Sequence, residues 1–497
     1  MRAHAVVLSA LAAIAQSALA QEPPPPAFAI VSLDSGPVDH VPGGPGIVAV
    51  GDVHVTGAAA LQLWFGMFSL PPGSRLRLTS ARDGAVQWFD RNSLVDYQYV
   101  SAWFNGDRVH VALAPGAGTV GNRIVVTKAR VEQGVAMPEL ICGPSDARVL
   151  SSDPRVGRLD GCCTTWLVDE RNMITAGHCI GGIGGQLVNF NVPLSDAGGN
   201  PQYPPPQDQY ALRAGSLTSV NGGLGNDYAV MSTVRNSNTG LYPGQAQGSW
   251  FATAPGPTGA QAVTWTVTGY GTSSVNATWS LAQKTLSGPR LAANNQLLQF
   301  FITVTGCNSG SPVIGATGAA HGVVTHAGCN GAGSNYGTGF GYAPFQQALD
   351  ALRQGFVAGT FAVYGQGCPG AGAPPQLALS GVPDLGGSVT FTVTGTDPGG
   401  DLPGLLGIGD SNTTWNGGPL PTDLAFMGLP GCALLIAPTM VFAQSTNFGN
   451  SAQVVAVPST AALLGARFFA QYFALDPGAT NPAQAVATNA GRIQLGN

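Results

Sequence analysis

Three short segments carry residue types that together could hydrolyse an amide bond. Residues 173–179 read Met-Ile-Thr-Ala-Gly-His-Cys, residues 225–231 read Gly-Asn-Asp-Tyr-Ala-Val-Met, and residues 305–313 read Thr-Gly-Cys-Asn-Ser-Gly-Ser-Pro-Val. Hydrolysis through a serine needs a base that takes the hydroxyl proton, a carboxylate that fixes the tautomer of that base, and backbone N–H groups around the developing oxyanion. The segments follow one another in the order His, Asp, Ser, and they offer all of these groups.

Each segment taken alone also has a purely structural interpretation. A His beside a Cys in an apolar stretch, an Asn-Asp turn before a strand, and an Asn-Ser-Gly-Ser-Pro loop are all ordinary features. Their joint occurrence favours catalysis, because Thr-Ala-Gly-His-Cys, Asp-Tyr-Ala-Val and Gly-x-Asn-Ser-Gly-Ser-Pro resemble the three active-site motifs of trypsin-like, chymotrypsin-fold serine proteases. The Asn before the serine resembles the bacterial glutamyl-endopeptidase-like branch of that family.

The resemblance implies a role for each residue. Ser309 would be the nucleophile, His178 the general base and then the general acid, and Asp227 the carboxylate that orients the imidazole. The backbone N–H groups of Cys307 and Ser309 would form the oxyanion hole. Asp208 is a rival carboxylate, but it lies in a Pro-rich stretch, whereas Asp227 opens an apolar strand that could bury it against the imidazole.

Features outside the three motifs extend the resemblance to about residues 138–356. The interval from Cys163 to Cys179 matches the spacing of the family's disulfide around the catalytic His, and Val267-Thr-Gly-Tyr-Gly271 resembles one of its strand-turn segments. Gly322-Val-Val-Thr-His326 resembles the strand that lines its specificity pocket. Residues 345–353 have the apolar spacing of the amphipathic C-terminal helix expected there.

The resemblance also indicates which residues would contact the side chain before the cleaved bond: Thr303 and Val304 at the base of the pocket, and Val324, Thr325, His326 and Ala327 in its walls. From Phe301 to Phe345 the sequence contains no Asp, Glu, Lys or Arg. Because burying an unpaired ion costs several kcal/mol, the pocket that the resemblance implies should favour cleavage after small or medium uncharged residues such as Ala, Val or Leu. Glutamyl endopeptidases place a His where Val324 stands, so their preference should not transfer, although His326 on the same strand face could receive an acidic group.

An even set of eight cysteines in an exported chain favours four disulfides. The resemblance implies a bond between Cys163 and Cys179. Cys162 and Cys307 are additions to the family pattern at positions that lie close together in the family, which favours a bond between them and leaves Cys142 for Cys329. The alternative joins Cys142 to Cys162 and Cys307 to Cys329. The last pair would be Cys368 with Cys432, the only cysteines of the C-terminal segment.

Two other chemistries could use the same residues. Cys162, Cys163, His178 and Cys179 have zinc-ligating side chains. However, neighbouring residues of a strand point to opposite faces, so two adjacent pairs would not readily converge on one metal. A Cys307 nucleophile is disfavoured because the tight turn presents Ser309. We therefore expect neither a metal nor a cofactor.

Two positions depart from the family pattern. Cys307 stands where the family nearly always has Gly, and a β-carbon would strain a backbone conformation that Gly alone adopts easily. Either the local φ is tolerable or the oxyanion hole is impaired. Asn308 stands where trypsin has an Asp that pairs with a new N-terminus on activation, so that ion-pair switch is absent. Arg155-Val-Gly-Arg158 imitates an activation site, but it lies too close to Cys163 for the family's spacing.

The composition and the N-terminus limit the class of protein. Of 497 residues only 45 are charged, the net charge is −5, and no cluster of Lys or Arg offers a nucleic-acid footprint. Residues 1–20 have the pattern of a signal peptide that ends in Ala18-Leu19-Ala20, and their apolar run is shorter than the ~18 residues that a membrane span needs. No later segment qualifies as a span, so we expect a secreted protein, extracellular or periplasmic.

Short β-prone runs bounded by turns lie on both sides of the segment that carries the motifs. We expect an N-terminal β domain over residues 21–137, which could be a pro-segment and which has a hairpin signal at Asn105-Gly106. A protease domain would follow over residues 138–358, and a separate β domain over residues 366–497. The expected fold is therefore mainly β, with a chymotrypsin-like double β-barrel flanked by two β-sandwich-like domains.

These observations favour a secreted, monomeric serine endopeptidase that acts on polypeptides. The alternative is a non-catalytic secreted protein in which a degenerate protease barrel and its flanking domains bind a surface ligand or glycan. The intact set of Ser309, His178 and Asp227 favours the enzyme, whereas Cys307 favours the alternative.

Overall fold

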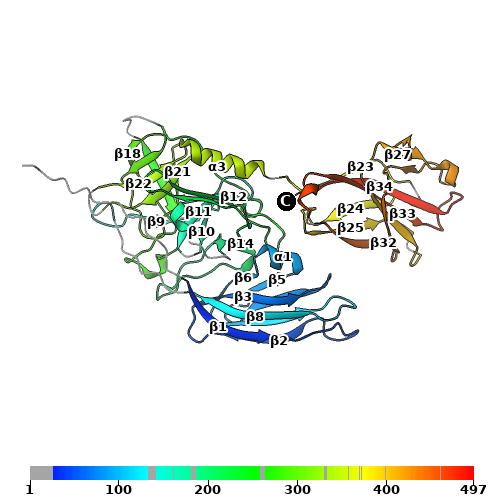
Figure 1. Ribbon diagram of the computed structural model, residues 1–497, viewed down its shortest axis with the longest axis horizontal. Helices are drawn as coiled ribbons and strands as arrows, with labels where there is room; N and C mark the ends of the chain where they lie inside the picture. Colours follow the sequence, from blue (N-terminus) through cyan, green and yellow to red (C-terminus); the bar gives the residue numbers. More distant parts are fainter. Residues whose placement is uncertain are drawn as a thin grey trace, which may run out of the picture. The chain divides into compact units, whose positions relative to one another are not determined.

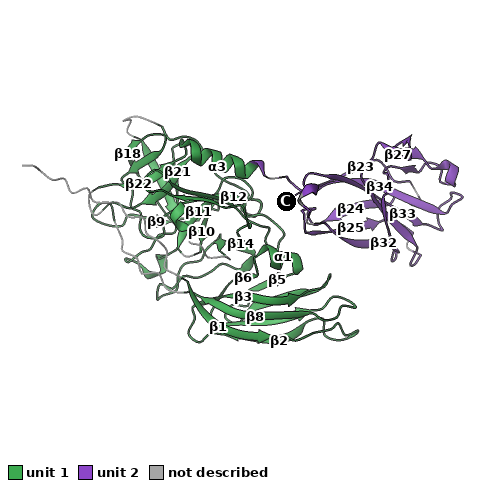
Figure 2. Ribbon diagram, in the orientation of Figure 1, with its two compact units in different colours: residues 1–353 green, residues 354–497 purple. Residues whose placement is uncertain are grey.

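The computed structural model describes residues 26–496 with the exception of 133–140, 161, 181–185, 258–262, 330–332, 356, 369, 371, 398 and 459. The predicted signal peptide lies outside the described residues. The chain divides into two compact units, residues 1–353 and residues 354–497 (Figure 2). The predicted N-terminal and protease domains thus belong to one unit. None of the helices described is both long enough and apolar enough to cross a membrane.

The first unit begins with two four-stranded antiparallel sheets, ordered β1-β8-β3-β6 and β2-β7-β4-β5 (Figure 1). Alternation of apolar and polar residues produces these strands: in β7, Val109, Val111 and Leu113 are buried, and the residues between them are more exposed. The bounds of the elements are β1 Ala27–Asp34, β2 Val48–His54, β3 Ala60–Ser69, β4 Arg75–Ser80, β5 Val86–Phe89, α1 Arg91–Asp96, β6 Val100–Asn105, β7 Arg108–Ala114 and β8 Arg123–Val131.

The prediction of a hairpin at Asn105-Gly106 is wrong. Strand β6 before the turn pairs with β3, whereas β7 after it pairs with β2 and β4 in the other sheet. Gly106 has a φ of 92°, and its N–H donates to the carbonyl of Ala59 at 2.7 Å. Gly106 therefore adopts the positive φ that glycine allows, but the turn leads the chain from one sheet to the other and does not form a hairpin.

The N-terminal sandwich shares its hydrophobic core with the segment that follows, which carries the three motifs, through Leu187, Tyr203 and Ala211. The ring of Trp103 stacks on Tyr203 with centroids 4.7 Å apart, and its Nε1 donates to the buried carboxylate of Asp160 at 3.0 Å. The side chain of Gln209 bonds both the backbone N–H and the carbonyl of Trp103, each at 2.8 Å. Through these contacts the sandwich packs directly against the rest of the first unit.

We expect Trp103→Ala to lower the free energy of unfolding of the first unit by about 3–5 kcal/mol, because it leaves a cavity in this shared core. The change also removes a hydrogen-bond donor from the buried carboxylate of Asp160. Trp64→Ala is the matched control, since Trp64 is only partly buried and its ring contacts Phe28 and Lys128 within the sandwich. Denaturant unfolding followed by tryptophan fluorescence measures both. Equal losses of stability for the two variants would contradict the shared core.

Two further sheets complete the first unit (Figure 1). One has the order β14-β13-β10-β11-β12-β16-β15; the other has the order β17-β20-β21-β22-β19-β18 and closes on itself because β17 also pairs with β18. The predicted mainly β fold with a double barrel is confirmed. The strands are β9 Val149–Leu150, β10 Val156–Leu159, β11 Cys163–Leu167, β12 Asn172–Thr175, β13 Leu187–Asn189, β14 Gln209–Ala211, β15 Thr218–Asn221, β16 Asp227–Ser232, β17 Thr264–Gly269, β18 Lys284–Ala293, β19 Leu297–Phe300, β20 Pro312–Ile314, β21 Ala320–His326 and β22 Asn335–Gly339.

Short helices join these strands, and one longer helix ends the unit. Helix α3 presents Phe345 and Leu349 to the core, and the ring of Phe345 stacks on Tyr228 with centroids 4.6 Å apart. The predicted amphipathic helix therefore packs against β16, the strand that begins at Asp227. The helices are η1 Gly177–Cys179, η2 Pro206–Asp208, α2 Pro243–Gln247, η3 Ala277–Trp279 and α3 Ala343–Gln354.

The second unit is a sandwich of a five-stranded sheet, β23-β34-β33-β26-β31, and a three-stranded sheet, β24-β25-β32. One core cluster draws on both sheets, and a disulfide joins Cys368 to Cys432. The elements are β23 Thr360–Tyr364, β24 Gln376–Ser380, β25 Ser388–Thr394, β26 Gly404–Gly409, β27 Thr414–Trp415, β28 Gly418–Pro419, β29 Thr422–Asp423, η4 Ala425–Met427, β30 Ala433–Leu434, β31 Met440–Ala443, β32 Asn450–Ala456, η5 Ala461–Leu463, β33 Arg467–Leu475 and β34 Ala485–Gln494.

Candidate active site

His178 and Asp227 form a buried pair. His178 lies in η1 just after β12, and Asp227 is the first residue of β16, the antiparallel neighbour of β12. This pairing places the end of one strand beside the start of the other. The Nδ1 atom of His178 lies 2.6 Å from Oδ2 of Asp227, the backbone N–H of His178 donates to Oδ1 at 3.1 Å, and both side chains are fully buried. The carboxylate therefore fixes the orientation of the ring and favours the proton on Nδ1.

The rival carboxylate, Asp208, lies elsewhere. It ends the short helix η2, and its Oδ1 accepts a hydrogen bond from the amide of Asn191 at 2.7 Å. Burial raises its pKa, and no cation is paired with it among the residues that the structure describes. Of the two candidate carboxylates, only Asp227 contacts His178.

Ser309 lies in a tight loop that a glycine makes possible. Gly310 has a φ of 89°, and a β-carbon there would lie 2.0 Å from the carbonyl oxygen of Thr164. Strand β11, which contains Thr164, also anchors the loop, because the N–H of Thr164 donates to the carbonyl of Ser309 at 2.8 Å. The Gly after the serine is therefore needed for close approach of the loop to β11, as well as for its backbone conformation.

The second ring nitrogen of His178 is unused. Its Nε2 is buried and lacks a hydrogen-bond partner anywhere in the described structure, and the hydroxyl of Ser309 likewise makes no hydrogen bond there. The structure thus does not contain a hydrogen bond between Ser309 and His178. Such bonds are often long or absent in a site without substrate. A buried imidazole nitrogen without a partner is an acceptor that can take the proton of a hydroxyl group.

The backbone at Cys307 adopts the left-handed conformation that favours glycine. Its φ is 74°, in the left-handed region, which costs a residue with a β-carbon about 1–3 kcal/mol. Cys162, its disulfide partner, also has a positive φ, of 99°. In the described part of the chain, neither the N–H of Cys307 nor that of Ser309 donates a hydrogen bond. The loop therefore keeps two donors free, as an oxyanion hole requires.

Residues 149–352 match the family model Trypsin. This segment is a trypsin-like domain. The similar solved structures include Glu endopeptidase in complex with MPD (18% identity, 43% of this chain and 100% of that chain, TM-score 0.35) and human heparin binding protein (15%, 42% and 97%, 0.32). A third is a thermostable serine protease, AL20, from an extremophilic microorganism (17%, 40% and 96%, 0.31). The comparison with curated proteins gave no match.

Three disulfides cross-link the first unit: Cys142–Cys329, Cys162–Cys307 and Cys163–Cys179. This pairing is the one that the sequence favoured, and the alternative pairing does not occur.

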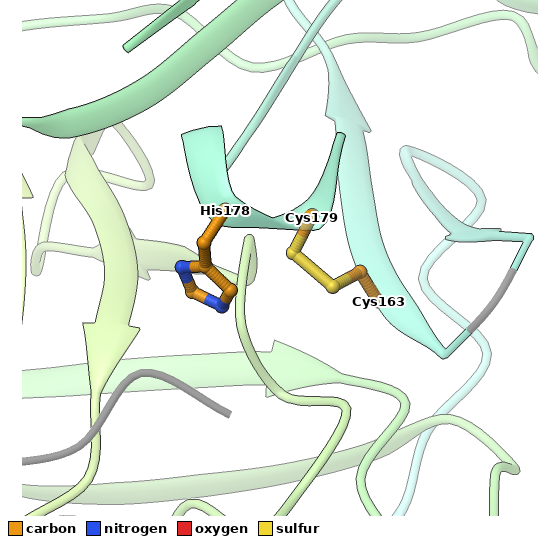
Figure 3. Close-up of side chains that lie close together, drawn as sticks. All are labelled: Cys163, His178 and Cys179. Carbon is orange, nitrogen blue, oxygen red and sulfur yellow. A yellow bond between two sulfur atoms is a disulfide. The ribbon is translucent and has the colours of Figure 1, made fainter. Parts of the chain in front are cut away.

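The ligating atoms of Cys163, His178 and Cys179 lie within 4.8 Å of one another, a spacing that could suit a metal. Figure 3 shows instead that the two sulfur atoms are bonded to each other beside the imidazole. In this state the cysteines offer no thiolates to a zinc ion.

A small pocket opens beside Ser309 in the trypsin-like domain. Five of the six residues predicted for the specificity pocket line it, namely Val304, Val324, Thr325, His326 and Ala327, and Thr305 is an addition. Thr303 does not line this pocket. Its hydroxyl accepts from the N–H of Cys142 at 3.1 Å and donates to the carbonyl of Cys142 at 3.3 Å. These hydrogen bonds join segments 161 residues apart, and the spacing of residues around Thr303 could not reveal them.

His326 brings a second imidazole to the site. Its ring centroid lies 6.3 Å from that of His178, and its Nδ1 lies 2.9 Å from the hydroxyl oxygen of Thr325. Burial lowers the pKa of His326; Asp227 acts to raise it, and His178 acts to lower it further. Since an ordinary imidazole loses its proton near pH 6.5, His326 is neutral at pH 7 and above. The pocket lining described above therefore carries no charge at that pH.

Proposed function

We propose that the chain is a secreted serine endopeptidase that hydrolyses peptide bonds through an acyl-enzyme on Ser309. The observation that carries the proposal is the state of His178: one ring nitrogen is held by the buried carboxylate of Asp227, and the other is buried without a partner. Membership of residues 149–352 in the trypsin-like family supports a polypeptide substrate.

The mechanism follows from these positions. The hydroxyl oxygen of Ser309 attacks the scissile carbonyl carbon as Nε2 of His178 takes its proton, and the N–H groups of Cys307 and Ser309 stabilise the resulting oxyanion. His178 then gives the proton to the leaving amine, and the C–N bond breaks to leave an ester on Ser309. A water molecule next attacks this ester, with its proton again going to His178. Collapse of the second intermediate returns that proton to Ser309 and releases the acid product.

The direct test of the proposed function is hydrolysis of unfolded casein by the purified full-length protein. We expect peptide release that stops after treatment with a serine-reactive fluorophosphonate. A correctly folded protein that releases no peptides, or one whose activity survives complete labelling of Ser309, would contradict the proposal.

The uncharged pocket predicts the preferred residue before the cleaved bond. At pH 8 we expect a peptide library to be cleaved after small or medium uncharged residues such as Ala, Val or Leu, with each methylene added or removed changing kcat/KM by about 10- to 200-fold. A dominant preference for Arg, Lys or Glu at pH 8 would contradict the prediction that an uncharged pocket selects the residue before the cleaved bond.

The lowered pKa of His326 adds a pH dependence to this preference. Protonation of His326 at a pH below its lowered pKa would add a positive charge to the pocket, so the ratio of kcat/KM for matched Glu and Gln substrates should rise as the pH falls. Using a ratio at each pH cancels any change in rate that the two substrates share. His326→Ala should abolish the rise; a rise that persists in this variant would exclude His326 as its source.

The domain organisation and location belong to the same proposal. Four disulfides fit an oxidising compartment, which supports export of the chain. We assign residues 21–137 to the N-terminal domain, 138–358 to the protease and 366–497 to the C-terminal domain. The shared core of the first unit supports retention of the N-terminal domain in the mature protein, in place of its removal as a pro-segment.

A further inference from the structure

A buried guanidinium lies directly behind the loop that carries Ser309. The Nη1 atom of Arg148 donates to the hydroxyl of Thr305 at 2.7 Å and to the side-chain carbonyl of Asn308 at 3.2 Å. Its Nη2 donates to the backbone carbonyl of Thr272 at 2.8 Å, and the side chain is only 2% exposed. One cation therefore contacts both ends of the segment 305–308, which includes Cys307.

Asp146 holds this guanidinium in place. Its two carboxylate oxygens accept from Nε and Nη2 of Arg148 at 2.8 and 2.6 Å, and its side chain is 7% exposed. Burial acts to raise the pKa of Asp146, but the hydrogen bonds and charge of Arg148 outweigh it, so the net pKa lies below the usual value and the carboxylate stays ionised. A forked pair of this kind fixes the direction of the remaining guanidinium donors.

The backbone around Arg148 is fastened on both sides. On one side, Cys142 is bonded to Cys329 and exchanges hydrogen bonds with Thr303. On the other, β9 begins at the next residue and pairs with β18. The guanidinium therefore projects from a fixed segment of the second barrel and not from a free chain end.

The space around Asn308 is shaped for this contact. A β-carbon on Gly271 would lie 2.1 Å from Oδ1 of Asn308 and 2.5 Å from Nη1 of Arg148, so glycine leaves room for their hydrogen bond. The same Oδ1 accepts from the N–H of Thr305 at 3.0 Å. A strained residue such as Cys307 persists only where its surroundings fix it, and these bonds fix the residues on either side of it.

We propose that Arg148 is a positioning residue that holds the oxyanion loop in its catalytic conformation from within the chain. The proposal rests on the proposed function, and it goes further because it makes catalysis independent of a newly formed N-terminus. Arg148 does not touch the reacting atoms; it acts through Asn308 and Thr305 on the N–H groups of Cys307 and Ser309.

The chain supplies a matched control for this proposal. Arg155 makes the same forked pair with the Asp two residues before it, with Nε and Nη2 of Arg155 lying 2.9 and 2.7 Å from the oxygens of Asp153. Its side chain is 29% exposed and lies over Phe251, and it makes no hydrogen bond to residues 305–309. Arg155→Ala thus removes an equivalent ion pair without touching the loop.

The test compares Arg148→Ala, Arg148→Lys and Arg155→Ala in the uncleaved full-length protein. We expect Arg148→Ala to lower kcat for a peptide ester by about 10²-fold, the scale of losing one oxyanion donor, with KM changed by less than about threefold. Arg148→Lys keeps the positive charge but cannot form the paired hydrogen bonds of a guanidinium, so its kcat should lie between those of Arg148→Ala and the wild type. Arg155→Ala should retain full activity. Equal kcat for Arg148→Ala and Arg155→Ala, or activity that appears only after chain cleavage, would overturn the proposal.

Amide hydrogen exchange gives a readout that does not depend on activity. We expect residues 305–309 to exchange faster in Arg148→Ala than in Arg155→Ala. Equal exchange in the two variants would overturn the proposal that Arg148 holds this loop. If Arg148→Ala fails to fold, Arg148→Lys takes its place in this comparison. A wild-type protein without hydrolytic activity would refute the proposed function, whereas the exchange difference would still decide whether Arg148 holds the loop.

Discussion

Ser309→Ala is expected to lower kcat for an ester or peptide substrate by about 10³- to 10⁶-fold, because it removes the hydroxyl that forms the acyl-enzyme in the proposed mechanism. KM should change little, since the small pocket beside this residue remains. The measurement is steady-state hydrolysis of a chromogenic ester, with protein concentrations high enough to detect the residual rate.

Ser311→Ala is the control for that experiment. Ser311 lies two residues further along the same loop, is fully buried, and has its hydroxyl 3.4 Å from the amide nitrogen of Asn308. We expect it to lose far less kcat than Ser309→Ala, because a neutral hydrogen bond contributes about 0.5–1.5 kcal/mol, which corresponds to roughly 2- to 13-fold. An equal loss in the two variants would mean that the loop, and not the hydroxyl of Ser309, is what activity requires.

Asp227→Asn should lower kcat by about 10⁴-fold while the fold is retained. The amide has nearly the shape of the carboxylate, but its NH₂ group would donate to Nδ1 of His178 and so favour the tautomer with the proton on Nε2. That tautomer cannot accept the proton of Ser309. Asp208→Asn is the matched control, because Asp208 does not contact His178. A full rate for Asp227→Asn, or equal losses in both variants, would contradict the assigned role.

The parts of the site that the sequence revealed are those with local signals. The three motifs predicted His178, Asp227 and Ser309 as catalytic residues, and the structure pairs the first two through adjacent strands. The residue types around Gly310 likewise indicated a tight turn that presents the serine. Each of these signals lies within a few residues of the group that it positions.

Contacts between distant segments could not be predicted where the family resemblance gave no indication of them. Asn105-Gly106 marked a turn but not which strands would pair across it, because pairing depends on the sheets that receive those strands. The contact of Arg148 with Asn308 spans 160 residues, and no spacing rule connects them. The shared core of the N-terminal sandwich and the barrel escaped prediction for the same reason, since Trp103 and Tyr203 are each ordinary core residues in sequence.

The most direct test of the central claim is labelling of the full-length protein with a fluorophosphonate, followed by peptide mass spectrometry. This reagent forms a stable phosphonyl ester only with a hydroxyl that a neighbouring base activates, so it reports the Ser309 and His178 pair without any assumption about substrate. We expect one label per chain, located on Ser309, and its loss in His178→Ala. A folded protein that takes no label, or one labelled at another serine, would contradict the role of Ser309 as nucleophile.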